Sequence, residues 1–331
     1  MEFGKIEYSS PICVIKMPDI CQLKCKYCFR EYNKKPELIK YLGEDINNLL
    51  QKYPEILTIS FLGGEPLLFE KEIRNIIDAT KHRIKKYIIT TNGLNLTEQN
   101  IKYFIDNHVQ INISLDGNRE DNDFNRGAGV YDKVIENIEI LYKIAPKNYF
   151  WTISSTFTKD TIKNMYKNYL HIRSITPKGW AINLDKYAEW SEKDLEIISN
   201  ELLKIKNHYN THPRTLKWFL DRISENNIIY NHSDHIIVHQ NGEIYQGFPF
   251  SKEILNIQNF EKIKLGNLNN LNNLKPITKW DYSSLRPCIS KKCKNCPLGY
   301  RTFYPYIKES HANLLCTVYS TLLNFNDRSK L

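Results

Sequence analysis

Short apolar runs rich in β-branched residues alternate with longer helical patterns through the first 185 residues, and this alternation strongly limits the folds open to the chain. Six runs have the length and composition of buried strands: Cys13–Met17, Ile56–Leu62, Tyr87–Thr91, Gln110–Ser114, Phe150–Phe157 and Trp180–Leu184. Helical patterns separate them at Pro36–Gln51, Glu70–His82, Thr97–Asn107, Val130–Ile144 and Thr161–Ile172. Because strands that alternate with helices form parallel sheets covered by those helices, we predict an α/β fold with a mostly parallel sheet or barrel.

The pattern changes after residue 185. Further helices are predicted at Trp190–His208 and Thr215–Asn226, followed by a hairpin at His235–Tyr245 that turns at Gln240-Asn241-Gly242. The Asn-, Leu- and Lys-rich stretch from Ile254 to Thr278 predicts loop and short helix. We therefore expect two domains, residues 1–210 and 228–331, the second being a small hairpin-plus-helix unit.

The composition predicts a globular protein with a sizeable core, because 41% of the 331 residues are hydrophobic, with 21 Tyr and 14 Phe among them. No stretch approaches the roughly 18 consecutive apolar residues of a membrane span, and the N-terminus lacks the apolar region of a signal peptide. We expect a cytoplasmic protein without membrane contact. Eight cysteines in such a chain favour metal or redox chemistry over disulfides.

The net charge of +9 is moderate, and its basic residues gather in two places. These are Lys81, Arg83, Lys85 and Lys86 in the first half, and Lys291, Lys292 and Lys294 in the second. Such groups form a solvated basic face or attract an acidic partner, for example the acidic leader of a peptide substrate. Nucleic acid is not expected, since no stripe of interleaved aromatic residues and arginines accompanies them.

Three cysteines, Cys21, Cys25 and Cys28, follow the first predicted strand within eight residues. A structural zinc site takes four ligands, usually as two Cys-x2-Cys pairs or as Cys-x2-Cys with a histidine pair. Three local thiolates leave one coordination position open to a ligand that is not protein, which suits a [4Fe–4S] cluster with an open iron. A partial zinc knuckle or plain buried cysteines are the alternatives.

Polar residues and glycines follow the later predicted strands, where the carboxyl ends of parallel strands form ligand sites. The segments are Gly63-Gly64-Glu65-Pro66, Thr90-Thr91-Asn92-Gly93, Ser114-Leu115-Asp116-Gly117 and Asp123-Phe124-Asn125-Arg126-Gly127. The glycine pair would let the backbone approach a ligand closely and adopt positive φ. Each segment alone is equally an ordinary turn.

The Cys-x3-Cys-x2-Cys spacing with an aromatic before the last cysteine, followed about 35 residues later by Gly-Gly-Glu-Pro, resembles radical S-adenosylmethionine (SAM) enzymes. The resemblance implies a partial (β/α)6 parallel barrel in which Cys21, Cys25 and Cys28 bind a [4Fe–4S] cluster. SAM would chelate the open iron, and an electron from a flavodoxin- or ferredoxin-like reductant would release a 5′-deoxyadenosyl radical.

The resemblance also assigns the residues that contact SAM. Tyr27 would lie against the adenine, and the carbonyls of the Gly63, Gly64, Glu65 and Pro66 segment would take the ammonium. The segments of Thr91, Asn92, Ser114 and Asp116 would line the ribose and carboxylate. Arg126 would pair with the SAM carboxylate in bidentate geometry, or it is a surface arginine that caps a loop.

Four more cysteines, Cys288, Cys293, Cys296 and Cys316, lie near the C-terminus. Four thiolates suit a structural zinc or a complete [4Fe–4S] cluster. With the hairpin before them, they resemble the SPASM or shortened twitch domain of radical SAM enzymes. A seven-cysteine SPASM domain has a cysteine where Gly247 stands and another before the hairpin, yet no cysteine lies between residues 28 and 288. The resemblance therefore implies one auxiliary [4Fe–4S] cluster rather than two.

The family likeness implies an enzyme that abstracts hydrogen from a peptide residue, forming a thioether or carbon–carbon crosslink in ribosomal peptide maturation. Formylglycine-type oxidation of a protein Ser or Cys, peptide epimerisation and small-molecule dehydrogenation are alternatives. Epimerisation requires a hydrogen donor such as the thiol of Cys13, which otherwise reads as a buried small hydrophobe. We expect no winged-helix peptide-recognition domain before Cys21. Outside enzymes, the alternative is a structural metal-binding protein.

Overall fold

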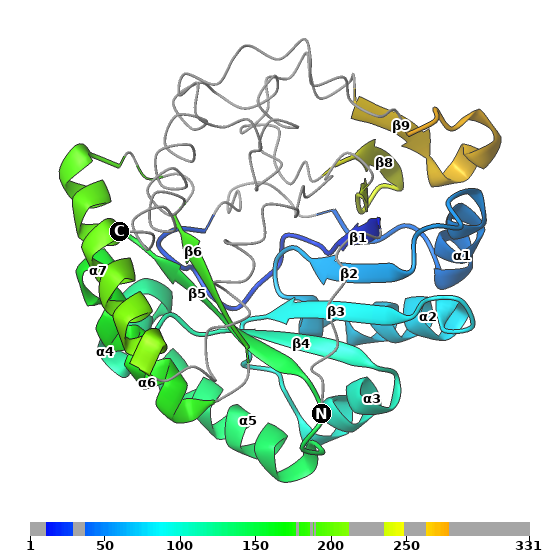
Figure 1. Ribbon diagram of the computed structural model, residues 1–331. Coiled ribbons are helices and arrows are strands. Elements are labelled where there is room, and N and C mark those ends of the chain that lie inside the picture. The colour runs from blue at the N-terminus through cyan, green and yellow to red at the C-terminus, as the bar shows by residue number, and fades with distance from the viewer. Residues whose placement is uncertain are drawn as a thin grey trace.

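Six parallel strands form the first part of the protein in the computed structural model (Figure 1). They are β1 (Ile12–Lys16), β2 (Thr58–Leu62), β3 (Lys86–Thr91), β4 (Val109–Ser114), β5 (Trp151–Phe157) and β6 (Gly179–Leu184). The structure describes residues 11–28, 37–176, 179–185, 188, 190–211, 235–247 and 263–277. The predicted α/β fold with a parallel sheet is confirmed, and all six strands lie within two residues of their predicted bounds.

Helices cover the outer side of this curved sheet (Figure 1). They are α1 (Gly43–Lys52), α2 (Glu70–Thr80), α3 (Glu98–Asp106), α4 (Arg119–Arg126), α5 (Val130–Ile144), α6 (Met165–Ile175) and α7 (Glu192–Thr211), with 3-10 turns η1 (Pro66–Phe69) and η2 (Ile162–Asn164). Among the described residues, no helix combines the length and apolar character that crossing a membrane requires.

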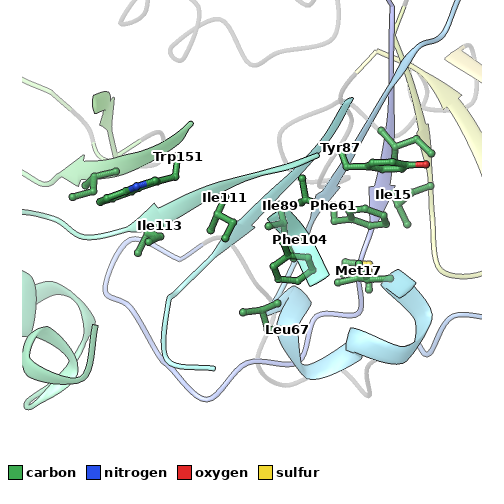
Figure 2. Packing of buried hydrophobic residues seen from close by; sticks show 14 of the residues in the cluster. Ile15, Met17, Phe61, Leu67, Tyr87, Ile89, Phe104, Ile111, Ile113 and Trp151 are labelled. Carbon is green, nitrogen blue, oxygen red and sulfur yellow. The ribbon is translucent and has the colours of Figure 1, made fainter. Parts of the chain in front are cut away.

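One row of apolar side chains runs across five strands beneath the helices (Figure 2). Ile15, Phe61, Ile89, Ile111 and Trp151 are paired in register from β1 to β5, and each is at most 1% exposed. Successive residues of a strand point to opposite faces, so this register sends the neighbouring residues to the inner face of the sheet. Because this row faces the helices, the residues before and after each of its members in the strands have their side chains on the inner face.

The inner face is polar on strands β3 to β5. Thr90, Asn112 and Thr152 are paired in register there and are linked by hydrogen bonds. The Asn112 amide donates to Thr90 Oγ1 (3.5 Å) and accepts from Thr152 Oγ1 (2.6 Å). Gln110 also donates to the Asn112 carbonyl oxygen (2.9 Å). A parallel sheet buried on both faces is ordinarily apolar on both, so this polar face indicates a functional interior.

The predicted hairpin is present and continues the same sheet. Strand β7 (Ile236–Val238) pairs parallel with β1, and antiparallel pairs follow to β8 (Glu243–Gln246) and β9 (Lys264–Asn267). Gly242, in the hairpin turn, has φ +82°, a conformation that favours glycine. The strand order is β6-β5-β4-β3-β2-β1-β7-β8-β9. The division into domains 1–210 and 228–331 stays a prediction.

Three elements differ from the sequence expectation. Helix α1 begins at Gly43 and not at Pro36, because Leu42 is extended and the Asp45 carboxylate accepts from its N–H (2.8 Å). Helix α4 was not predicted, since its eight residues include a single apolar side chain and show no apolar period. Strand β9 lies where loop and short helix were expected, whereas the 3-10 turn η5 (Leu268–Asn273) agrees with that expectation.

Candidate active site

The three cysteines of the first motif lie in the loop that follows β1, and all three are partly buried. Burial raises the pKa of the Cys25 thiol to about 11, while the Arg126 guanidinium lowers it. Cys21 and Cys28 also raise this pKa, so both of these sulfurs lie within electrostatic reach of Cys25. The fold therefore groups the three predicted ligands beside a cation.

The donor set fits an iron–sulfur cluster better than a single ion. Among the described residues, no three His, Cys, Asp or Glu side chains converge closely enough to hold one metal ion. In a [4Fe–4S] cluster each thiolate binds a different iron, so its ligands need not converge on one point. Three separated thiols in one loop are consistent with that arrangement.

The glycine pair after β2 packs directly against the cysteine loop. A Cβ on Gly63 would lie 2.4 Å from the Met17 carbonyl oxygen, and one on Gly64 would lie 2.2 Å from the Ile20 carbonyl oxygen. The Gly64 N–H donates to the Pro18 carbonyl (3.2 Å), and the Glu65 N–H donates to the Ile20 carbonyl (2.7 Å). The pair thus fastens the loop that carries the cysteines, and its contact with a SAM ammonium stays a prediction.

Glu65 connects the ends of β2 and β3. Its carboxylate is 1% exposed and accepts from the Leu67 N–H (2.9 Å), Thr91 Oγ1 (2.7 Å) and the Asn92 N–H (2.7 Å). Pro66 occupies the first position of η1, where a residue without an N–H is favoured. In the structure Glu65 holds protein groups in place, and its predicted contact with SAM stays a prediction.

Asn92 reaches the cysteine loop from the end of β3. Its Nδ2 donates to Cys21 Sγ (3.5 Å) and to Gln22 Oε1 (3.2 Å). Its Oδ1 accepts from the Leu94 N–H (2.9 Å). Since the backbone donor occupies the oxygen, the amide can present only its nitrogen to the sulfur.

A buried ion pair lies beside the cysteine loop. Arg126 and Asp116 have side chains 6% and 0% exposed, and Arg126 donates to Asp116 Oδ1 at 2.8 Å. Tyr27 donates its hydroxyl to Asp116 Oδ2 (2.8 Å), and the Thr156 N–H donates to Oδ1 (2.9 Å). Burial lowers the pKa of Arg126, but Asp116, Tyr27 and Cys25 together more than offset this, so the pKa lies above its ordinary value. Arg126 is therefore a fixed, buried cation and not a surface residue.

One donor of this cation has no partner among the described residues. Arg126 Nε is buried and makes no hydrogen bond within the part of the chain that the structure describes. An unpaired buried donor is costly, and a bound carboxylate would satisfy it. The carbonyl of Asn125 accepts from the Lys26 N–H (2.9 Å), which ties the end of α4 to the cysteine loop. Thiols, cation and free donor together fit a cluster that binds a carboxylate-bearing ligand.

Ser114 ends β4 on the inner face, in register with Ser154 of β5. Asn183 of β6 donates to Ser154 Oγ (2.9 Å), so polar groups continue across this edge. Ser114 is partly exposed and lies two residues before the buried Asp116. Its contact with SAM stays a prediction.

Cys13 lies on the opposite side of the sheet. It is fully buried in the layer between strands and helices, whereas its neighbour Val14 packs on the inner face with Ile237 and Tyr245. Burial raises the pKa of the Cys13 thiol to about 12. This placement favours the interpretation as a core residue, and the role of hydrogen donor stays a prediction.

Two positioning residues were missed at the sequence level. Gln240 of the hairpin turn donates to the Met17 carbonyl (2.8 Å), and Asn125 donates to Asp116 Oδ2 (3.3 Å). Asn125 precedes Arg126, so the motif could have indicated it, but nothing in the sequence links Gln240 to residue 17. The predicted auxiliary ligands Cys288, Cys293, Cys296 and Cys316 lie outside the described residues.

Residues 15–169 match the radical SAM superfamily. The cysteine-type anaerobic sulfatase-maturating enzyme of Clostridium novyi is 31% identical over 165 residues, which cover 44% of this chain and 44% of that enzyme.

Solved structures are similar over most of the chain. AnSMEcpe with bound AdoMet superimposes with a TM-score of 0.70 at 19% identity, covering 96% of this chain and 97% of that one. Streptococcus suis SuiB bound to S-adenosylmethionine gives 0.63 at 16% identity, with 92% and 76% covered. AnSMEcpe has also been solved with a Cp18Cys peptide, and SuiB with its precursor peptide SuiA. These likenesses establish a shared fold.

Proposed function

We propose that this protein is a radical SAM enzyme that acts on a peptide, abstracting hydrogen from one residue and forming an oxidative thioether or carbon–carbon crosslink. The enzyme class rests on residues 15–169 and on the shared fold. The observation that carries the assignment to this site is the grouping of three thiols with a buried arginine whose Nε has no hydrogen-bond partner among the residues that the structure describes. A bound cluster and SAM supply reductive cleavage of a carbon–sulfur bond, which yields a carbon radical able to take hydrogen from a substrate.

Different residues of this chain would bind the cluster and SAM. Cys21, Cys25 and Cys28 would hold the cluster, and Arg126 would bind the carboxylate of SAM. Asp116 is buried and keeps Arg126 oriented, and the partly buried Tyr27, which donates its hydroxyl to Asp116, helps to shield the pair from water. A guanidinium fixed before the ligand arrives loses little rotamer entropy on binding.

A peptide substrate is supported by the inner face and by the named relatives. The amide and hydroxyl groups of Asn112, Thr90 and Ser154 offer donors and acceptors that suit peptide backbone groups. Among similar proteins, the sulfatase-maturating enzyme is named for its action on a protein, anSMEcpe binds a Cp18Cys peptide, and SuiB binds the precursor peptide SuiA. Because the chain spans 44% of the sulfatase-maturating enzyme, the substrate is a proposal.

Oxidative crosslinking requires an electron acceptor. A thioether forms when a substrate carbon loses a hydrogen atom to the deoxyadenosyl radical, a cysteine thiol loses a proton, and one electron leaves as the new C–S bond closes. Cys288, Cys293, Cys296 and Cys316 would hold an auxiliary [4Fe–4S] cluster, which would supply an acceptor for that electron. An external flavodoxin- or ferredoxin-like reductant would supply the electron that starts each turnover.

The first experiment measures iron, sulfide and EPR spectra on the anaerobically reconstituted protein and on a variant with Cys21, Cys25 and Cys28 all replaced by Ala. We expect the variant to keep about four irons at the C-terminal segment that contains Cys288, Cys293, Cys296 and Cys316, called the tail below. It should lose all SAM cleavage. SAM cleavage by that variant would overturn the assignment of the cluster. If the tail binds zinc or no metal, redox-neutral radical chemistry would be favoured over oxidative crosslinking.

Mass spectrometry of candidate peptides, incubated with SAM and reductant, then separates the reactions. Loss of two hydrogens with a new crosslinked fragment supports the proposal. Formylglycine at a Ser or Cys would show that the reaction is protein oxidation and not crosslinking. Deuterium taken up from D₂O without net oxidation would show that it is epimerisation. Deoxyadenosine formation that is stimulated by small molecules and never by peptides would overturn the peptide assignment.

A further inference from the structure

The sulfur of Cys21 receives two N–H groups. The Leu23 N–H donates to it at 3.4 Å, as part of the cysteine loop itself. Asn92 Nδ2 donates at 3.5 Å from the end of β3, 71 residues further along the chain. A loop thiolate requires no donor from another strand in order to bind iron, so the second contact calls for a separate explanation.

Asn92 is held so firmly that its contact with Cys21 is directional. The side chain is 7% exposed, its Oδ1 is occupied by the Leu94 N–H, and its backbone N–H is bound by the Glu65 carboxylate. The Glu65 N–H in turn binds the Ile20 carbonyl, next to Cys21. Glu65, Asn92 and the cysteine loop thus form a closed set of contacts that fixes the distance between the amide and the sulfur.

We propose that Asn92 is a positioning residue that raises the reduction potential of the cluster by donating its amide N–H to the Cys21 thiolate. A hydrogen bond to a cluster sulfur stabilises the reduced cluster, which carries one more negative charge, more than the oxidised one. This role differs from the contact with SAM that the family resemblance implies. It rests on the proposed function only in requiring a cluster at Cys21, Cys25 and Cys28.

The test is an EPR-monitored redox titration of the reconstituted full-length protein and its variants. The signal that changes when SAM is added identifies the cluster with the open iron. In Asn92→Asp, a nearly isosteric carboxylate cannot donate, and Asn92→Ala removes the group altogether. For both we expect a more negative midpoint potential, seen as a fall of about tenfold in the ratio of reduced to oxidised cluster at a fixed ambient potential.

Gln22→Ala is the matched control. It removes the other acceptor of Asn92 Nδ2 from an exposed residue in the same loop and leaves the N–H to the sulfur in place. Its potential should equal that of the unaltered protein. Equal potentials in the Asn92 variants, or a matching shift in Gln22→Ala, would overturn the proposal.

A second measurement keeps the test decisive if the Asn92 variants bind little cluster. In protein labelled with ¹⁵N at asparagine, pulsed EPR of the reduced cluster should show one coupled side-chain nitrogen. Absence of that coupling in the unaltered protein would overturn the role of Asn92. Failure of the proposed function is distinguishable, because the unaltered protein would then hold no SAM-responsive cluster at all.

Discussion

At the scale of single residues, much of the site consists of groups that hold other groups in place. Glu65 joins two strand ends, Asp116 orients Arg126, and the glycine pair allows two backbone segments to touch. None of these roles requires contact with a substrate. The sequence motifs therefore mark both the predicted ligands and the residues that position them.

Gly64→Ala should disturb the cysteine loop. Its new Cβ would lie 2.2 Å from the Ile20 carbonyl oxygen, so the loop must shift and its two hydrogen bonds to Gly64 and Glu65 must weaken. We expect a loss of about 1–3 kcal/mol in the free energy of unfolding and a reduced iron content after reconstitution. Denaturant unfolding and iron analysis check both.

Gly129→Ala is the control for that prediction. Its φ of +77° strains any residue other than glycine, but beyond its chain neighbours no atom of the described residues lies within 4 Å of the added Cβ. It should lose about 1–2 kcal/mol of stability and keep its full iron content. Equal iron content in both variants would contradict the steric argument.

At the scale of elements, the sequence predicted those that bury a regular apolar pattern. The six strands of the parallel sheet and helix α5 follow such patterns, so their positions were predicted closely. Helix α4 buries Asp121, Asn122 and Asn125 instead, and Asn118 caps it through the Asp121 N–H (3.0 Å). Its stability comes from tertiary hydrogen bonds, which leave no periodic apolar pattern in the sequence from which the helix could be predicted. The pairing of Asn92 with Cys21 is likewise tertiary, and proximity in sequence could not predict it.

The hairpin contains a carboxylate whose charge should stabilise it. Burial raises the pKa of Glu243, but hydrogen bonds from Lys264, Asn241 and Tyr245 outweigh burial and lower the pKa from 4.5 to about 2. A depressed pKa gives stability that is complete above pH 4.5 and is lost as the pH falls through about 2. Partial exposure limits the effect to about 1 kcal/mol.

Glu243→Gln should therefore lower the free energy of unfolding by about 1 kcal/mol at pH 6, and by progressively less as the pH falls from 4.5 towards 2. Parallel denaturant titrations across this range measure the difference between the two proteins. A difference that does not change with pH would show that the carboxylate acts by its shape and not by its charge.

At the scale of the whole molecule, one sheet joins the first strand to the C-terminal hairpin. Strand β1 lies between β2 and β7, and Gln240 links the hairpin turn to the start of the cysteine loop. The predicted auxiliary cysteines follow that hairpin in the chain. The tail is therefore a candidate for both structural support and electron transfer, and the two roles can be separated.

Cys293→Ala should leave deoxyadenosine formation intact and block the crosslinked product, since the electron released on bond formation would lack its acceptor. Chromatography of the nucleoside and mass spectrometry of the peptide measure the two steps. The control, Cys25→Ala, should abolish both. Normal product formation by the Cys293 variant would reduce the tail to a scaffold.

The position of β1 in the sheet also determines when the protein can become complete during synthesis. The Met17 carbonyl accepts a hydrogen bond from a residue 223 positions further along the chain, and one edge of β1 pairs with β7. Neither contact can form until the hairpin has been synthesised. A nascent chain that has already presented its three cysteines still has an open strand edge beside them, which other chains can pair with. We expect cluster insertion to follow synthesis and docking of the hairpin, so the supply of chains in which β7 has paired with β1 would set how fast active enzyme accumulates.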